Sequence, residues 1–439
     1  MKAELERINR QKIPLVKGDL ETLRRKFFHT GEAPTFMWRV DFAEVFADKM
    51  GFDIGIGNPP YNVLNKFEAQ AMKSDTEKMK RDPWLAPAFG GVLNLYRIFL
   101  LRSVSILRPS GCLSMIVQCA VLSDKTAGPL REFLFNHTQL IRVDAFPERD
   151  NEHTRLFESA KMSTAILLLK NHKDNHPFEV RAHYAREVLP TVPCGIMTRD
   201  FVKQVDPETY GIPLLKGEEI GIFAKVMKHS KLKEFTRCYT GEIDLTLQRL
   251  YITQNSSHTR MVKGAEVQKY HFVAKMSQGE FEYVNAKAYL KDTKGPKSSH
   301  HQECRIVMQG ITGVNEKVRL KVTLLNPPAF CGNSVNYILA DDLPLDPKYL
   351  LGVLNSSLLN WLFKLQSTNS NVNGYEVDRL PIAVTDRTYQ KSIAELVNRC
   401  MSAYSNGKKC VEVEKQIDEL VYRLYGLKAE EIAIVEGSD

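Results

Sequence analysis

The ten residues from Phe52 to Tyr61 constrain the fold of this chain more than any other stretch. They read Phe-Asp-Ile-Gly-Ile-Gly-Asn-Pro-Pro-Tyr, an apolar run that ends in Gly57 and is followed at once by a polar and aromatic tip. The apolar run is typical of a buried strand, and tandem prolines continue neither a helix nor a sheet while they hold the backbone extended. Asn58 and Tyr61 are therefore predicted to project from a rigid loop at the carboxyl end of a strand, where open α/β sheets bind their ligands.

The segments that follow this stretch alternate between helical and strand-like hydrophobic patterns. This alternation predicts a partial doubly wound, Rossmann-like α/β domain. The predicted elements are helices at 93–107 and 126–137 and strands at 112–121, 141–146 and 163–169. Further expectations are an amphipathic helical lead-in at 1–30, a strand-like aromatic stretch at 36–46 and a mobile cover at 66–91.

With 439 residues and 43% hydrophobic residues, the chain is long enough for two main domains and a terminal extension. The predicted second domain is a mixed α/β unit of short strands, and it ends in a helical tail. Its clearest pieces are strand-like stretches at 280–290, 304–309 and 335–339, a single long helix at 349–365, and two helices from Gln390 onward. The predicted division is 1–50 lead-in, 51–195 first domain, 196–388 second domain and 389–439 helical tail.

The charge and the cysteines limit the classes of function that fit this sequence. The net charge is +8, and lysine and arginine outnumber acidic residues between Arg199 and Phe330, which favours a polyanion partner for that region, although such a bias also occurs on an ordinary solvated surface. The eight cysteines form no CxxC pair and indicate reduced thiols. With neither a signal h-region nor a long apolar run, the chain is predicted to be cytoplasmic, without a membrane partner.

The chemistry that needs the Asn-Pro-Pro-Tyr tip is methyl transfer to an exocyclic base amine, whose lone pair is delocalised into the ring. The Asn58 side-chain oxygen and the Pro59 backbone oxygen can accept both amine hydrogens and make the nitrogen nucleophilic, so no general base is required. Tyr61 offers a flat face to an extruded purine. Taken alone, four such residues are equally consistent with a simple turn.

The sequence segments around this tip favour the catalytic interpretation over a simple turn. The segments 38–46, 52–61, 94–99, 111–121 and 155–169, in this order, resemble the gamma-class N6-adenine DNA methyltransferases, especially type IIG restriction-modification enzymes, in which methylation and target recognition share one polypeptide. The resemblance implies S-adenosylmethionine as cofactor, double-stranded DNA as partner, and the second domain as a target-recognition domain. It also implies that Phe157 packs on the flipped adenine opposite Tyr61, although an aromatic beside an apolar strand is more usually part of a core.

One departure from that family concerns the cofactor. Gamma-class enzymes place their glycine-rich turn and acidic cofactor contacts before the catalytic loop, yet only 57 residues precede Asn58, too few for three strand-helix units of roughly 30 residues each. The only candidate for a permuted order, at 328–334, lacks the second glycine. We therefore expect a truncated or split form, weak or inactive alone, whose upstream polypeptide supplies the cofactor site and any nuclease. Within this chain, cofactor contacts would be limited to Asp41 and Asn58.

DNA contacts are predicted on two polar loops and one strand of the second domain. The candidates are Lys294 and Lys297 in the loop 294–301, Arg305 just after it, and Asn371 and Asn373 in the loop 367–374. His300, His301 and Cys304 suggest zinc at first sight, but adjacent imidazoles do not easily share one ion, and no metal site is predicted. The rival hypothesis is a DNA-binding specificity module without catalysis that keeps the loop as inheritance.

Overall fold

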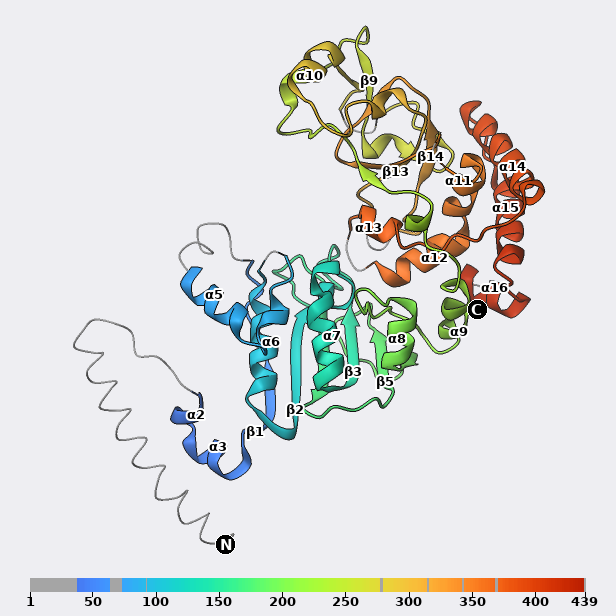
Figure 1. The fold of residues 1–439 in the computed structure, drawn as a ribbon. Coiled ribbons are helices and arrows are strands. Elements are labelled where there is room, and N and C mark those ends of the chain that lie inside the picture. The colour runs from blue at the N-terminus through green and yellow to red at the C-terminus, as the bar shows by residue number, and fades with distance from the viewer. Residues whose placement is uncertain are drawn as a thin grey trace.

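The computed structural model describes residues 38–63, 73–91, 93–276, 279–313, 316–341, 343–367 and 370–437. The predicted lead-in at 1–30 lies outside these residues. Figure 1 shows two regions, with a sheet flanked by helices at one end of the molecule and a second region of small sheets and helices at the other. The α/β architecture predicted from the sequence is confirmed.

The first region is built on one six-stranded sheet with the strand order β1-β2-β4-β3-β5-β6. Strand β1 is parallel to β2 and β3 is parallel to β5, whereas the other neighbours are antiparallel. The strands are β1 (Phe52–Gly57), β2 (Leu107–Gln118), β3 (Gln139–Phe146), β4 (Thr164–Lys170), β5 (Phe178–Ala182) and β6 (Cys194–Met197). The helices are α2 (Trp38–Asp41), α3 (Ala43–Lys49), α5 (Lys73–Arg81), α6 (Leu95–Ser105), α7 (Gly128–His137) and α8 (Arg199–Val205).

Among the described residues, the helices beside this sheet cover one face of it. Figure 1 shows α6, α7 and α8 on the same side of the strands. Leu113, Met115 and Val117 of β2 point to that side, alternating with less buried neighbours, and they belong to the main hydrophobic core. The period of two in the sequence therefore identifies the strand, and the helices above it decide which half of the residues is buried.

The opposite face of the sheet carries an apolar stripe that no described core residue covers. Ile54 and Ile56 of β1 are 68% and 84% exposed, and through the strand register they share this face with Ile116, Ile166 and Leu168. None of the five belongs to the hydrophobic core or packs against it. Since β1 is also an edge strand of the described sheet, both its outer edge and this face are open.

The stretch at 36–46 is helical in its described part, so the strand-like prediction is wrong there. Trp38, Phe42 and Phe46 recur every four residues, which is the spacing of one helix face. All three rings pack around Phe52, with centroid distances of 6.0, 5.3 and 5.8 Å. The aromatic density suggested a strand, but the spacing was the better signal.

The second region contains two four-stranded sheets, a short hairpin and a group of helices. The sheet orders are β14-β13-β16-β7 and β15-β9-β12-β8. The strands are β7 (Tyr239–Thr240), β8 (Ile252–Thr253), β9 (Thr259–Val262), β10 (Val267–Gln268), β11 (His271–Phe272), β12 (Glu282–Val284), β13 (Arg305–Gln309), β14 (Val322–Leu325), β15 (Ala329–Cys331) and β16 (Val335–Leu339). The helices are α9 (Glu219–Val226), α10 (Ala286–Asp292), α11 (Pro347–Asn355), α12 (Ser357–Gln366), α13 (Gly374–Val377), α14 (Arg387–Ser405), α15 (Val411–Leu424) and α16 (Ala429–Glu436).

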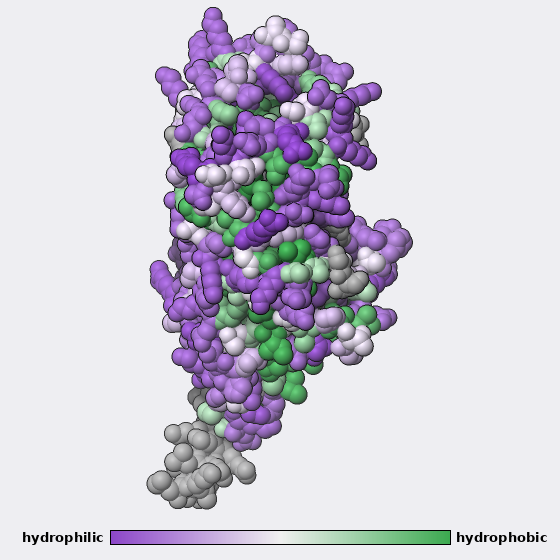
Figure 2. Space-filling view, turned by 90° about the vertical axis from the view of Figure 1, so that its right-hand side faces the viewer, coloured by the Kyte–Doolittle hydropathy of each residue, from purple (hydrophilic) through white to green (hydrophobic). Residues whose placement is uncertain are grey.

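The tail predicted as two helices from Gln390 onward contains three, α14, α15 and α16, because Gly407 and Gly426 interrupt the helical run with positive φ. Two other predicted elements of this region differ from the structure because a capping residue lies inside an apolar run. The long helix predicted at 349–365 is two helices, since Ser356 adopts an extended conformation and its hydroxyl accepts a hydrogen bond from the Leu359 N–H. The strand predicted at 280–290 ends early, because Asn285 caps α10. On the side seen in Figure 2, apolar groups reach the surface in scattered patches among hydrophilic ones.

Candidate active site

The Asn-Pro-Pro-Tyr tip follows β1 directly and is anchored on both sides by backbone contacts. Gln118, the last residue of β2, donates a side-chain hydrogen bond to the Tyr61 carbonyl oxygen at 3.4 Å. Leu95, the first residue of α6, donates its N–H to the Asn62 carbonyl oxygen at 3.2 Å. The tip is therefore held between a strand end and a helix start, and its place after the carboxyl end of a strand is the predicted one. The Gln118 contact was not predicted, since nothing in the local sequence marks it.

The acceptor atoms at the tip differ in their availability. Asn58 is exposed, and its side-chain oxygen accepts a hydrogen bond of 2.7 Å from the Tyr61 hydroxyl. That hydroxyl also lies 3.2 Å from the Ile116 carbonyl oxygen, and burial raises the pKa of Tyr61 to about 12, so it remains a donor at neutral pH. No described residue donates a hydrogen bond to the Pro59 carbonyl oxygen.

The structure brings Phe157 to the same tip. The rings of Tyr61 and Phe157 have centroids 6.3 Å apart and planes tilted by 54°. A flat base between two parallel rings needs two van der Waals separations of about 3.5 Å each, or about 7 Å in all. At 6.3 Å and with this tilt the two rings contact each other directly, so they would have to move apart to admit a base between them.

A braced loop between β3 and β4 holds Phe157 in this position. Arg155 donates its Nε–H toward the Phe157 and Glu158 carbonyl oxygens, at 3.1 Å each. Glu148, at the start of the loop, accepts backbone hydrogen bonds from Asp150 and Asn151 at 2.8 and 3.0 Å. The supporting roles of Arg155 and Glu148 were not predicted, because they act through backbone atoms and leave no spacing pattern.

Asp41, the other candidate cofactor contact, lies elsewhere. It ends α2, whose Trp38 packs on Phe52 at the first position of β1, whereas Asn58 follows the last position of that strand. The structure therefore does not bring Asp41 and Asn58 together. The glycines of β1 serve the sheet instead: a Cβ on Gly55 would lie 2.9 Å from a methyl group of Leu113 on β2.

The predicted DNA contacts of the second region fall into two groups. Lys294 and Asn371 are exposed. Lys297 and Asn373 are half-buried: Lys297 donates to the Thr240 carbonyl oxygen at 2.7 Å, and Asn373 donates to the Glu376 carboxylate at 2.9 Å as part of the cap of α13.

Arg305 is not available to a nucleic acid in this structure. Its side chain is 0% exposed and pairs with the equally buried carboxylate of Glu242 at 2.8 Å. It also donates to the Ala329 carbonyl oxygen and lies over the ring of Tyr337. The prediction that Arg305 contacts DNA therefore does not fit the structure, because a cation that the sequence shows as part of a basic region is used inside the domain.

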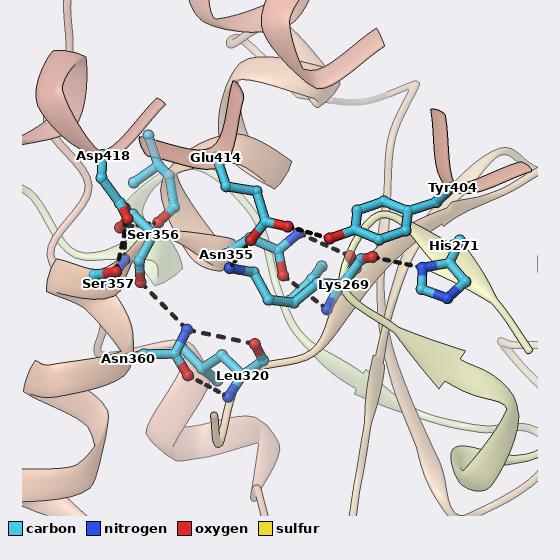
Figure 3. Close-up of polar contacts among 12 residues, drawn as sticks. Lys269, His271, Leu320, Asn355, Ser356, Ser357, Asn360, Tyr404, Glu414 and Asp418 are labelled. Carbon is cyan, nitrogen blue, oxygen red and sulfur yellow. Dashed lines mark hydrogen bonds and ion pairs between the residues drawn. The ribbon is translucent and has the colours of Figure 1, made fainter. Parts of the chain in front are cut away.

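A buried polar network joins the small strands to the carboxyl-terminal helices (Figure 3). Lys269, beside the hairpin of β10 and β11, forms an ion pair of 2.6 Å with Glu414 of α15. Asn355 of α11 donates to and accepts from the backbone of Val322 on β14, at 2.8 and 3.0 Å. Asp418 accepts the N–H and the hydroxyl of Ser357. These contacts fix the helices against the sheet from several directions.

The adjacent histidines have structural partners of their own. The Nδ1 atom of His300 lies 2.7 Å from the Tyr337 hydroxyl, and the ring of His301 stacks on Phe330 with centroids 4.5 Å apart. Among the described residues, no cluster of three metal-binding side chains is found. Over the same residues, no helix is both long enough and apolar enough to cross a membrane.

Comparison with known families decides what this arrangement resembles. Residues 3–151 match the Eco57I restriction-modification methylase family, and residues 259–382 match the family described as a TaqI-like C-terminal specificity domain. The chain is thus similar to a restriction-modification methylase family in its first part and to a specificity-domain family in its second. This confirms the resemblance drawn from the sequence, and the names methylase region and specificity domain are used below for the first and second regions.

Individual relatives are longer than this chain. RM.MjaORFECS2P of Methanocaldococcus jannaschii, named as a type II restriction enzyme and methyltransferase, is 22% identical over 425 residues, which is 89% of this chain and 32% of the relative. Among solved structures, the type IIL restriction-modification enzyme MmeI in complex with DNA is similar in fold, with a TM-score of 0.53 and 10% identity over 88% of this chain and 56% of that one. The chain thus spans about a third of the first protein and little more than half of the second.

Proposed function

We propose that this chain carries the base-acceptor half of a site-specific DNA methyltransferase of a type IIG restriction-modification system, which methylates the N6 amine of adenine. The observation that carries the proposal is the grouping of Asn58, Tyr61 and Phe157 around one tip at the carboxyl end of β1. Three residues from two distant segments converge there, with an acceptor oxygen and two aromatic faces. No such convergence is needed for a simple turn.

In the proposed reaction, a flipped adenine enters between the rings of Tyr61 and Phe157. Stacking on such side chains contributes about 1–3 kcal/mol per base. The oxygens of Asn58 and Pro59 accept the two hydrogens of the amine and localise its lone pair on nitrogen. For this to happen the Tyr61 hydroxyl must leave the Asn58 oxygen, so base entry exchanges one hydrogen bond for another.

The methyl donor in the proposal is S-adenosylmethionine, which supplies an electrophilic methyl group on a sulfonium. The described residues fit the acceptor but not this donor. The glycines of β1 are packed against β2, and Asp41 lies at the far end of the strand from Asn58. We therefore derive no step through the cofactor and assign no residue here to binding it.

We propose that a further polypeptide segment, from the upstream part of such an enzyme, completes the donor half. The open edge of β1 and the apolar stripe of Ile54 and Ile56 beside it support this proposal. A parallel strand is normally buried on both faces, and exposed strand edges readily accept another strand. The complementing segment would lie next to Asn58, where the donor is needed.

The specificity domain is proposed to bind double-stranded DNA in the cytoplasm. Exposed Lys294 and Asn371 are the candidates for direct contact, with Lys297 and Asn373 supporting the same loops. A second candidate function, a DNA-binding specificity module without catalysis, is favoured by one observation: the Asn58 acceptor is occupied by Tyr61. The two proposals differ in whether any partner restores methyl transfer.

The test uses labelled S-adenosylmethionine and mixed-sequence duplex DNA, with the chain alone and with the polypeptide encoded upstream of it. The proposal expects transfer only in the complemented reaction. There, Asn58→Ala should lower methyl transfer by about 100-fold or more while DNA binding persists. Asn62→Ala is the matched control, because only the backbone of Asn62 is used by the tip.

Several outcomes would contradict one or other part of the proposal. Transfer by the chain alone would refute the need for a donor segment. DNA binding without transfer in either reaction would favour the specificity module. An active Asn58→Ala variant would refute the role of Asn58 in binding the amine.

A further inference from the structure

A short turn in the specificity domain presents two leucines to solvent. Leu247 and Leu250 are 79% and 76% exposed, among the most exposed large apolar side chains of the described residues. They lie three residues apart between β7 and β8. Single exposed apolar side chains are ordinary on a protein surface. Two exposed leucines on one turn form an apolar tip, and exposed apolar groups that lie together are typical of interaction sites.

This turn is braced by hydrogen bonds. The Asp244 carboxylate accepts the N–H groups of Thr246 and Leu247 at 2.9 Å each, and these bonds lower the pKa of Asp244. The Gln248 side chain accepts the Asp244 N–H at 2.7 Å, and the Gln248 N–H returns to the Asp244 carbonyl oxygen at 3.0 Å. The leucines are therefore held outward by a fixed backbone.

The neighbours of the two leucines explain why the turn cannot simply fold them inward. Leu245 packs into a small core below the turn, and Tyr251 stacks edge to face on Tyr289 with centroids 5.6 Å apart. The Tyr251 hydroxyl also donates to Asp292 at 3.0 Å. The inward positions are thus filled by Leu245 and Tyr251, which leaves Leu247 and Leu250 outside.

A row of cations lies beside this tip. Helix α10, which carries Tyr289 on its inner side, exposes Lys287 and Lys291 on its outer side, and exposed Lys294 follows. Residues four apart share a helix face, so the first two point the same way. Figure 1 places α10 on the side of the specificity domain away from α14 and α15. The lysines suit a partner with an anionic surface, and the apolar tip suits an apolar interior of the same partner.

We propose that Leu247 and Leu250 form a wedge that inserts at a base step of duplex DNA, while Lys287, Lys291 and Lys294 contact the neighbouring phosphates. The inference rests on the proposed DNA binding of the specificity domain and adds a mode of contact to it. Apolar side chains that enter between base pairs unstack them and kink the duplex by about 20–90°. A rigid turn suits this role, because a flexible one would fold back rather than separate two stacked bases.

The experiment begins with a duplex selected from a random-sequence pool by the full chain. Its affinity and its bend, from energy transfer between dyes at the two ends, are then measured for the wild type and for Leu247→Gln/Leu250→Gln. We expect at least about tenfold weaker binding and a loss of most of the bend. Thermal stability should be unchanged, since both side chains are exposed.

Two further variants separate the wedge from other roles. Val411→Gln changes another exposed apolar side chain, 57% exposed at the start of α15, and should alter neither affinity nor bend. Lys287→Ala should reduce the salt dependence of binding but keep the bend. If the double leucine variant bound and bent the duplex as the wild type does, the wedge alone would be overturned. The same holds if the only effect of that variant were a loss of self-association of the chain. Failure of the wild type to bind any duplex would overturn the proposed DNA binding together with the wedge.

Discussion

The methylase region and the specificity domain use their polar side chains in opposite ways. At the tip of β1, the acceptor groups of Asn58 and Pro59 lie at the end of a strand, where the proposed function has them bind the adenine amine. In the specificity domain, many charged side chains pair with other groups of the same domain, as Arg305 does with Glu242. The position of a proline-fixed tip can thus be predicted from a few residues, whereas a basic region does not show which of its cations are used inside the domain.

The largest effect that would test this difference is expected at Glu242. Glu242→Ala leaves Arg305 charged and buried without its carboxylate, which should destabilise the specificity domain by about 3–5 kcal/mol. Urea denaturation measures the change. Glu242→Ala/Arg305→Met should recover much of the loss, because it removes the unpaired charge.

DNA binding by that double variant tests whether Arg305 is a DNA contact. If Arg305 were a DNA contact, the variant would be stable but would bind DNA more weakly. We expect stable protein with unchanged binding, which would sharpen the distinction between cations that build the domain and cations that face a ligand.

The hydrophobic pattern predicted strands β1 to β4 and helices α6 and α7 of the methylase region closely, because one face of its sheet is covered and the period of two survives in β2 and β4, whereas the short β5, β6 and α8 were not predicted. The tip was predictable for a different reason, since proline fixes the backbone around Asn58 whatever the surroundings. The helices near Trp38 were missed because aromatic content was weighed above the four-residue spacing. The pairing of Arg305 could not be predicted, since Glu242 lies 63 positions away and only the folded sheet brings the two together.

A smaller effect is expected where the strands meet the carboxyl-terminal helices. Glu414→Gln keeps the shape of the side chain but removes the charge that faces Lys269, and it leaves one acceptor oxygen where the carboxylate has one for Lys269 and one for the Tyr404 hydroxyl. We expect a loss of about 1.5 kcal/mol, seen as faster amide exchange in β10 and β11. Glu419→Gln on the same helix is the control, since its exposed contact with Arg423 at 3.9 Å should contribute little. Equal exchange in both variants would show that the network of Figure 3 does not hold the domain together.

At the tip of β1, the expected effect of Tyr61→Phe is a gain in base capture. The variant keeps the aromatic face but removes the hydroxyl that occupies the Asn58 oxygen. A net hydrogen bond is worth about 1 kcal/mol, so capture of the flipped base should become about fivefold stronger. The fluorescence of 2-aminopurine at the target position reports this capture. Tyr61→Ala should weaken it through lost stacking, and weaker capture by Tyr61→Phe would mean that the hydroxyl assists the base rather than competing with it.

The smallest effect is expected at Lys294, which tests whether any single exposed cation of the specificity domain faces DNA. Each phosphate contact that is lost lowers the slope of log affinity against log salt by about one. Lys294→Ala should therefore reduce this slope by about one and leave unfolding unchanged, because the side chain is exposed. Lys415→Ala, an exposed lysine on α15, should change neither quantity. If both variants lowered the slope equally, the attraction would come from the overall charge of the protein. Lys294 would then not be a specific DNA contact.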